Sequence, residues 1–288
     1  MNNKLLIAAL AATTLTANAA IDITGNYEGT FTDGSGASYA QDLDLTLVGS
    51  TEGAKVTVMM EDLTGGSTVT ATQVFVEADL EGIDVKAGNY KNQNGSGLLQ
   101  TKSAVTNQFE VSTSLAGASL TLGQVSEASK VTVDASMEIA GLDVNVQNVT
   151  ATDRFITVVT NFFGFGTTVE SQNTAVGRNS AVALTANIAL GETSAVTATT
   201  VYMDVNDATT LTQDDGILGD VSGATNGSSV KGAVLSTATS FGTVTGKMYD
   251  VNETNTFVGE IARGALTVGY TKTDDVDGVV DAKIDVAF

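Results

Sequence analysis

The chain contains no cysteine, no histidine, no proline and no tryptophan among its 288 residues. Without cysteine it forms no disulfide and has no thiolate chemistry, and without histidine it lacks the commonest metal ligand and general base. Hydrolases whose sites depend on histidine are therefore excluded. An exported protein of this size that has no disulfide must obtain its stability from extensive strand pairing or from closure of a sheet.

Positive charge is also scarce. The sequence has 13 Lys and Arg against 33 Asp and Glu, which gives a formal net charge of -20. Such a protein repels nucleic acid and small anions and attracts cations, so we expect no nucleic-acid partner. The hydrophobic content of 42% is too high for a disordered chain. The abundance of Thr, Val, Ala, Ser and Gly favours β-structure with tight turns over helices.

Residues 1–19 have the pattern of a secretory signal peptide. A basic residue, Lys4, precedes an apolar run that begins at Leu5, and an Ala-Asn-Ala sequence ends at Ala19. The run is too short for a membrane-spanning helix with these flanks. We therefore predict a cleavable signal peptide over 1–19 and a mature chain over 20–288; the alternative is a buried first helix.

From Ala20 onward one pattern repeats: about ten residues of alternating polarity, followed by a cluster of Gly, Asn, Asp or Ser. The segments that fit this pattern are predicted as eighteen strands. They are Ile21–Phe31, Gln41–Val48, Ala54–Asp62, Thr68–Leu80, Ile83–Tyr90, Ala104–Leu115, Ala118–Val125, Lys130–Ile139, Leu142–Thr150, Arg154–Phe162, Phe165–Gln172, Ser180–Leu190, Ala195–Asp204, Ser229–Thr239, Thr243–Asp250, Thr256–Ala262, Ala265–Thr271 and Val279–Phe288.

The connections between these strands alternate between short and long. Pairs such as Ala140-Gly141 and Phe163-Gly164 predict tight hairpins, whereas 91–103 and 205–228 are much longer. Short turns on one rim and long loops on the other are typical of membrane barrels. We therefore predict an all-β fold, a transmembrane antiparallel up-and-down β-barrel of about 16–18 strands. A soluble sandwich with a second layer fits the alternation as well.

The last segment, 279–288, shows the alternation most clearly. One side of the extended chain is wholly apolar and ends in Phe288, whereas the other side carries Asp281, Lys283 and Asp285. In a closed barrel the apolar side faces lipid and the charged side faces water.

These features resemble those of the general-diffusion porins of Gram-negative bacteria, especially their alphaproteobacterial branch. The resemblance rests on the leader, the alternating strands, the long loop after the fifth strand and the terminal Phe288. Two short motifs add to it, Asp84-Val85-Lys86-Ala87-Gly88-Asn89-Tyr90 and Asp281-Ala282-Lys283-Ile284-Asp285-Val286-Ala287-Phe288. General porins have sixteen strands, so the predicted eighteen depart from the family.

The resemblance implies a water-filled channel in the bacterial outer membrane through which small hydrophilic solutes and ions diffuse passively. It also implies contact with outer-membrane lipid and lipopolysaccharide, a homotrimer, no enzymatic activity and no cofactor. In that family the loop after the fifth strand folds into the barrel and narrows the pore. Here that loop is 91–103, which holds Lys91 and Lys102 and no acid. An ordinary surface loop is the open alternative.

The candidate pore-lining residues are charged side chains on the polar side of the predicted strands, together with the two lysines of that loop. They are Asp42, Asp44, Glu77, Asp79, Asp84, Lys86, Lys91, Lys102, Glu110, Asp134, Glu138, Lys283 and Asp285. The same phase rule places Lys231 and Lys247 inside. Because acids outnumber bases in this set, we expect a weak to moderate preference for cations.

Residues 204–220 form an acidic loop in which oxygen ligands cluster. Weak calcium binding there is one interpretation. The loop lacks the twelve-residue spacing and the closing Glu of a calcium loop, which favours a solvated or lipopolysaccharide-facing segment. No other metal site is predicted.

A second function from a different class is a secreted surface-layer or fibre subunit built of soluble β-domains. The acidic composition rich in Thr, Ala and Gly is also common in such proteins. The sequence shows no fixed-period repeat of the kind that a solenoid needs.

Overall fold

The computed structural model describes residues 20–34, 36–61, 63, 71–95, 97–99, 101–102, 106–125, 130–150, 152–190, 194–208, 217–218 and 224–287. The predicted signal peptide, 1–19, and the terminal Phe288 lie outside this part of the chain. Within the described part, no helix is long and apolar enough to cross a membrane.

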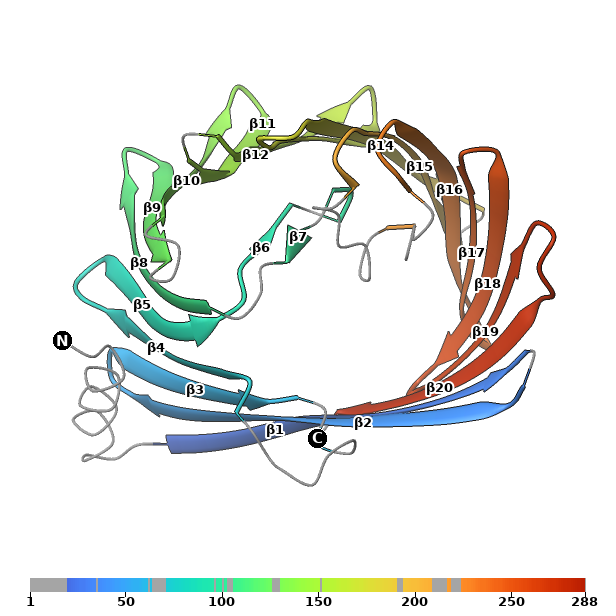
Figure 1. Ribbon diagram of the computed structural model, residues 1–288, viewed down its shortest axis with the longest axis horizontal. Helices are drawn as coiled ribbons and strands as arrows, with labels where there is room; N and C mark the ends of the chain where they lie inside the picture. Colours follow the sequence, from blue (N-terminus) through green and yellow to red (C-terminus); the bar gives the residue numbers. More distant parts are fainter. Residues whose placement is uncertain are drawn as a thin grey trace.

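The strands follow one another around a single ring (Figure 1), which is an 18-stranded sheet. Its strands are β1 (Ala20–Asp33), β2 (Ser38–Thr51), β3 (Ala54–Met60), β4 (Gln73–Asp79), β5 (Ile83–Tyr90), β8 (Thr106–Leu115), β9 (Ala118–Val125), β10 (Lys130–Ile139), β11 (Leu142–Val149), β12 (Arg154–Phe162), β13 (Phe165–Asn173), β14 (Arg178–Ala189), β15 (Ala195–Val205), β16 (Ser228–Thr239), β17 (Gly242–Val251), β18 (Thr254–Arg263), β19 (Leu266–Thr273) and β20 (Val279–Ala287). A separate pair, β6 (Gln93–Asn94) and β7 (Thr101–Lys102), lies inside the ring (Figure 1).

The first and last strands of the ring pair with each other. β1 pairs with β2 along one edge and with β20 along the other, and Tyr27 lies opposite Val286. Every pairing in the ring is antiparallel, and apart from β1–β20 each joins strands that follow one another around the ring in chain order, so the sheet closes without a free edge. The predicted all-β barrel and its strand number, the upper value of 16–18, are confirmed.

One rim of the barrel is made of tight hairpins. In these turns two consecutive residues have positive φ, which is the type I′ geometry that matches the twist of paired strands. The turns are Glu81-Gly82, Ala116-Gly117, Ala140-Gly141 and Phe163-Gly164. The segments 91–105 and 206–227 connect strands at the opposite rim. The predicted contrast between a short-turn rim and a long-loop rim is therefore confirmed.

The outer face of the barrel is apolar. On five neighbouring strands, β16 to β20, large hydrophobic side chains that are 42% to 59% exposed point away from the ring: Leu235, Met248, Ile261, Val268 and Ile284. Exposure of so many aliphatic side chains on one continuous surface is unfavourable in water and favourable in the acyl-chain region of a bilayer.

The inner face of β12 to β17 differs from the predicted polar lining. Val201, Met203 and Val230 point into the ring and are at most 5% exposed. Because Val230 points inward, its neighbour Lys231 points outward, opposite Tyr202 and Asp250 on the adjacent strands. The prediction that Lys231 faces the interior is wrong, because aliphatic side chains occupy the inner positions of β16.

Candidate functional site

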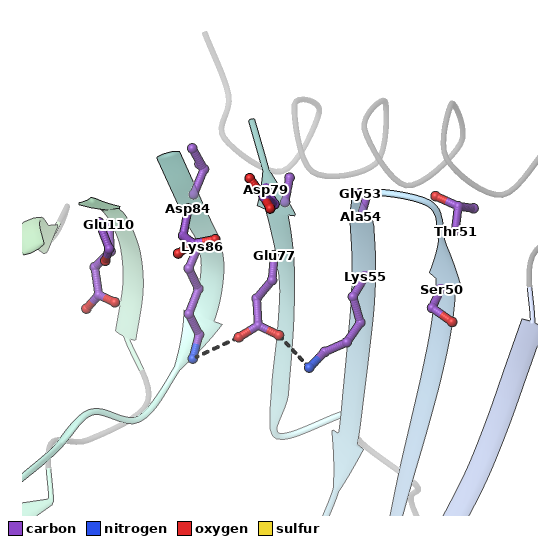
Figure 2. A pocket seen from close by; sticks show the side chains of 13 residues that line it. Ser50, Thr51, Gly53, Ala54, Lys55, Glu77, Asp79, Asp84, Lys86 and Glu110 are labelled. Carbon is purple, nitrogen blue, oxygen red and sulfur yellow. Dashed lines mark ion pairs between the residues drawn. The ribbon is translucent and has the colours of Figure 1, made fainter. Parts of the chain in front are cut away.

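Linked ion pairs run across the inner wall of β3, β4 and β5 (Figure 2). Lys55 Nζ lies 2.7 Å from Glu77 Oε2, and Lys86 Nζ lies 3.8 Å from Glu77 Oε1. The three residues occupy directly opposed register positions on neighbouring strands, so strand alternation alone brings them together. All three are partly exposed, so these pairs add little to stability. Glu77 is shared by the two lysines, so it offsets one of their two positive charges.

Two aromatic rings also hold Lys86. Its Nζ lies 4.4 Å from the ring centroid of Phe75 and 4.4 Å from that of Tyr90. A cation over an aromatic face is attracted to the ring, and both rings are buried, which strengthens the interaction. Lys86 is therefore held in place from three sides.

A polar cavity of about 540 Å³ lies against this wall. Its charged lining residues are Lys55, Glu77, Asp79, Asp84, Lys86 and Glu110, several of which Figure 2 shows side by side. Asp79 and Asp84 are direct cross-strand partners in the β4–β5 hairpin. Within the described part of the chain neither forms an ion pair. The structure thus brings together five of the predicted residues in one cavity.

The next strands, β8 to β11, carry an acidic arc made of Glu110, Asp134, Glu138 and Asp143. Glu138 and Asp143 lie opposite each other and line a second cavity of about 490 Å³. Glu110 accepts a hydrogen bond of 2.6 Å from Asn92 Nδ2, and Asp134 accepts one of 2.5 Å from the Asn148 N–H. Among described side chains no Lys or Arg lies within 4 Å of a carboxylate of this arc.

The strands that close the barrel carry four more of the predicted charges. Lys283 Nζ on β20 lies 2.7 Å from Glu28 Oε2 on β1 and 3.9 Å from Asp285 Oδ2. Asp42 and Asp44 on β2 share this inward face, opposite Glu28 and Asn26 in register. Lys283 therefore lies between two carboxylates, whereas Lys55 and Lys86 share one.

The loop after β5 folds into the barrel. Lys91, at its start, pairs with Glu61 at 3.1 Å. Farther along, the Gly95 N–H donates to Gln147 Oε1 at 3.0 Å on β11, and the Leu99 N–H donates to Glu170 Oε2 at 2.7 Å on β13. The loop thus reaches strands well away from its own (Figure 1). The surface-loop alternative is wrong. Lys102 lies in β7, but its side chain is outside the described part.

A second loop, 206–227, meets the first one inside the barrel. The Ile217 N–H donates to the Gly97 carbonyl at 3.0 Å. Leu218 is 1% exposed and packs on the wall at Gly232, where an added Cβ would lie 2.6 Å from Leu218 Cδ2. The absence of a side chain at Gly232 therefore gives Leu218 its place.

Both loops contribute to one apolar cluster on the inner wall of β12 to β17. Its buried members are Leu98, Leu99, Phe155, Ala181, Ala183, Val201, Met203, Val205, Leu218, Val230 and Val251. Sequence reasoning missed this cluster. Two signals were present. One is an adjacent Leu pair in a polar loop. The other is the run from Val201 to Val205, in which Val201, Met203 and Val205 share an apolar face and Tyr202 and Asp204 share the opposite face.

The acidic loop considered for calcium is only partly described. Its Asp207 is 1% exposed and accepts a hydrogen bond of 2.7 Å from Thr174 Oγ1. Asp214, Asp215 and Asp220 lie outside the described residues. In the described part of the chain no group of three or more acidic side chains is arranged to hold a metal ion. Calcium binding by 204–220 stays a prediction.

At the long-loop rim, Asp274 in the β19–β20 connection accepts hydrogen bonds from Asn255. Both the backbone N–H and Nδ2 of Asn255 donate to Asp274 Oδ2 at 2.9 Å. These bonds favour the ionised carboxylate and lower the pKa of Asp274. The Asp274 carboxylate therefore stays ionised to a lower pH than an unperturbed aspartate does.

No family model matches this sequence, and no curated protein sequence matches it either. Solved structures do match the fold. The chain is similar to OpdL of Pseudomonas aeruginosa, with a TM-score of 0.62 and 9% identity over 94% of this chain and 98% of that one. It is also similar to OccAB3 of Acinetobacter baumannii, with a TM-score of 0.59 and 9% identity over 94% and 99% of the two chains.

A third similar structure is a mutant of Rhodopseudomonas blastica porin, with a TM-score of 0.53 and 13% identity over 93% of this chain and 100% of that one. At these identities the likeness concerns the fold. The chain has the architecture of a porin barrel along nearly its whole described length.

Proposed function

We propose that this protein is an outer-membrane channel through which small hydrophilic solutes and ions diffuse passively. The supporting observation is the separation of its two faces: aliphatic side chains cover the outside of a closed sheet, and ion pairs and carboxylates cover much of the inside. A closed barrel has no unpaired backbone edge, which permits it to cross a bilayer. A ring of about 18 strands is wide enough to hold an aqueous channel.

The channel prefers cations in this proposal. The lysines of the inner wall, such as Lys55, Lys86 and Lys283, lie within 4 Å of carboxylates, so their charges are largely cancelled. The acidic arc of β8 to β11 has no such partner among described residues. An excess of fixed negative charge in a narrow lumen raises the local concentration of cations and lowers that of anions.

Passive diffusion requires no catalytic group, because a pore needs only a polar lumen of suitable bore and charge. The predicted signal peptide delivers the chain to the periplasm. Lipopolysaccharide contact and a homotrimer are further parts of the proposal. They are supported by the apolar outer surface, which must be covered by lipid or by other copies of the chain.

The experiment is a planar-bilayer recording with the purified full-length mature chain in a tenfold KCl gradient. We expect stepwise conductance increases and a reversal potential whose sign shows cation preference. Absence of conductance from correctly folded protein contradicts the channel. Conductance with an anion-selective reversal potential supports the channel but contradicts the assigned charge of its lumen.

A matched variant pair tests where the selectivity originates. Glu138→Gln with Asp143→Asn removes two charges from the acidic arc without a change in shape, and we expect the reversal potential to move toward zero. Glu253→Gln, in the turn after β17, serves as the control and leaves the reversal potential unchanged. An unchanged value in the arc variant would assign selectivity to other residues.

The alternative of a surface-layer or fibre protein predicts soluble β-domains with a second layer. The described strands instead form one closed sheet whose outer face carries exposed aliphatic side chains. No observation favours that alternative.

A further inference from the structure

The three arginines of the sequence share an unusual placement. Arg154, Arg178 and Arg263 are all exposed, and all occupy outward register positions. Arg154 precedes the inward, buried Phe155, and Arg178 precedes the inward, buried Asn179. The paired bases of the inner wall are lysines. The guanidinium groups thus face the surroundings of the barrel and not its lumen.

Two of these arginines lie together at the long-loop rim. Arg154 is the first residue of β12 and lies opposite Asn173 on β13, and Asn173 lies opposite Arg178, the first residue of β14. Adjacent strands are about 4.8 Å apart, so the two arginine Cα atoms are about 10 Å apart on one row. Arg263 lies at the opposite, short-turn rim.

Neutral oxygens hold both guanidinium groups in position. Arg178 Nε donates to Ser171 Oγ at 3.0 Å. With the amide oxygen of Asn173 facing Arg154, that oxygen accepts from Nε at 3.2 Å and from Nη2 at 2.9 Å. Among described residues neither arginine forms an ion pair. Two oriented positive charges with no ion-pair partner among the described residues therefore stand at the surface of a strongly acidic protein.

The surface below this pair is apolar, and no second pair of arginines lies on the described outer face, where the other outward bases are the single residues Lys231, Arg263 and Lys272. Val169 and Leu184, on β13 and β14, point outward and are 44% and 45% exposed. On the described outward positions of β20 and of β1 to β11 there is no Lys or Arg. A ligand that fits here carries anionic groups at the rim and acyl chains along the barrel.

We propose that Arg154 and Arg178 form a binding site for the phosphate groups of lipid A in the outer leaflet. A guanidinium group matches phosphate oxygens with two parallel N–H bonds, and Arg178 keeps its terminal nitrogens for such a contact. Lipid A combines phosphate with acyl chains that cover Val169 and Leu184. The proposal rests on the outer-membrane location given above and adds a specific lipid contact to it.

The test measures binding of diphosphoryl lipid A to the purified, folded barrel by native mass spectrometry and by the shift in thermal unfolding. The test variant is Arg154→Gln with Arg178→Gln, and Arg263→Gln is the matched control at the other rim. We expect the wild type and the control to bind alike and the double variant to bind at least about tenfold more weakly, since charge-assisted bonds are lost. The variant Arg154→Lys with Arg178→Lys keeps both positive charges but loses the parallel N–H groups of the guanidinium. We expect its affinity for lipid A to fall between those of the wild type and the double Gln variant.

Two further probes separate the sources of phosphate. Lipid A stripped of its phosphates binds the wild type as weakly as the double variant does, if the proposal is right. Phosphatidylglycerol binds more weakly than lipid A. Equal affinity of the double variant and the wild type for lipid A would overturn the site, and so would equal binding of dephosphorylated lipid A. If phosphatidylglycerol binds as tightly as lipid A, the assignment of the Arg154–Arg178 site to lipid A is overturned.

Folding and channel activity are checked separately. Conductance in a bilayer of uncharged lipid depends on the lumen and not on these outward arginines, so each variant is expected to keep it. A variant that conducts normally and loses lipid A binding supports the site. Loss of conductance in the wild type itself would contradict the channel and leave the lipid measurement interpretable on its own.

Discussion

At the scale of single residues, Leu99 helps to hold the inner loop against the barrel wall. Its side chain and that of the adjacent Leu98 are 0% exposed, and the Leu99 N–H donates to the carboxylate of Glu170, which is itself fully buried. Thr157 donates to the other oxygen of Glu170 at 3.3 Å. A buried carboxylate needs such donors, because an unsatisfied charge away from water is strongly unfavourable.

We predict that Leu99→Ala loosens the loop and widens the channel. Removal of a buried Leu side chain costs about 2–5 kcal/mol in a packed core. The expected results are a higher and noisier single-channel conductance and earlier cleavage of the loop by added protease. Leu235→Ala, which shortens an outward side chain that is 55% exposed, is the control and changes neither. Wild-type conductance in the Leu99 variant would show that the loop does not limit the pore.

Residue-level prediction worked where a strand has one charged and one apolar face. The inward positions of Glu77, Lys86 and Glu110 follow from alternation alone, and the structure places them side by side. That they line a conducting pore stays a prediction. The prediction for Lys231 was wrong because its strand has aliphatic side chains inside and a charge outside. Alternation separates the two faces of a strand but does not determine which of them points into the barrel.

At the scale of elements, β5 depends on a glycine. Gly88 has a φ of +143°, and a Cβ added there would lie 2.2 Å from the Val74 carbonyl oxygen and 2.6 Å from Phe75 Cα. A glycine in this conformation permits the close approach of β4 to β5. The contact also places the Phe75 ring, which packs edge-on against Tyr90 with centroids 5.7 Å apart.

We predict that Gly88→Ala destabilises the barrel by about 1–3 kcal/mol, because backbone must move to admit the methyl group. The measurement is the urea midpoint for loss of the compact band in unheated gel samples. Gly246→Ala on β17 is the matched control, since a Cβ there meets no atom within 4 Å. Equal midpoints for the two variants would show that β4 and β5 separate at little cost.

Strands and tight turns were predictable because their signals are local. The period of two, the Gly-containing pairs and the spacing of the segments gave the eighteen strands of the ring. Boundaries were less accurate: the predicted strand at Thr68–Leu80 begins at Gln73, and β2 runs from Ser38 to Thr51 instead of Gln41 to Val48. The short β6–β7 pair escaped notice, because two-residue strands have no periodicity to detect.

At the scale of the whole molecule, closure and the contents of the lumen have different origins. Pairing of β1 with β20 follows from the alternation of both strands and from the strand count. Leu98 and Leu99 of the first loop meet Leu218 of the second against the inner wall of β12 to β17, although the two loops are far apart in sequence. No local pattern reports such contacts, and the family resemblance implied only the first loop.

In the proposed channel, water fills the ring and acyl chains surround it. The chain has no cysteine, so one introduced thiol is unique. Thr245 lies on the inner face of β17, where its hydroxyl is hydrogen-bonded to that of Ser236 on β16. Met248, also on β17, points outward and is 59% exposed. In vesicles we expect a charged methanethiosulfonate reagent to label Thr245→Cys rapidly and to leave Met248→Cys unlabelled until detergent is added. Labelling of Met248→Cys with protection of Thr245→Cys would contradict the account.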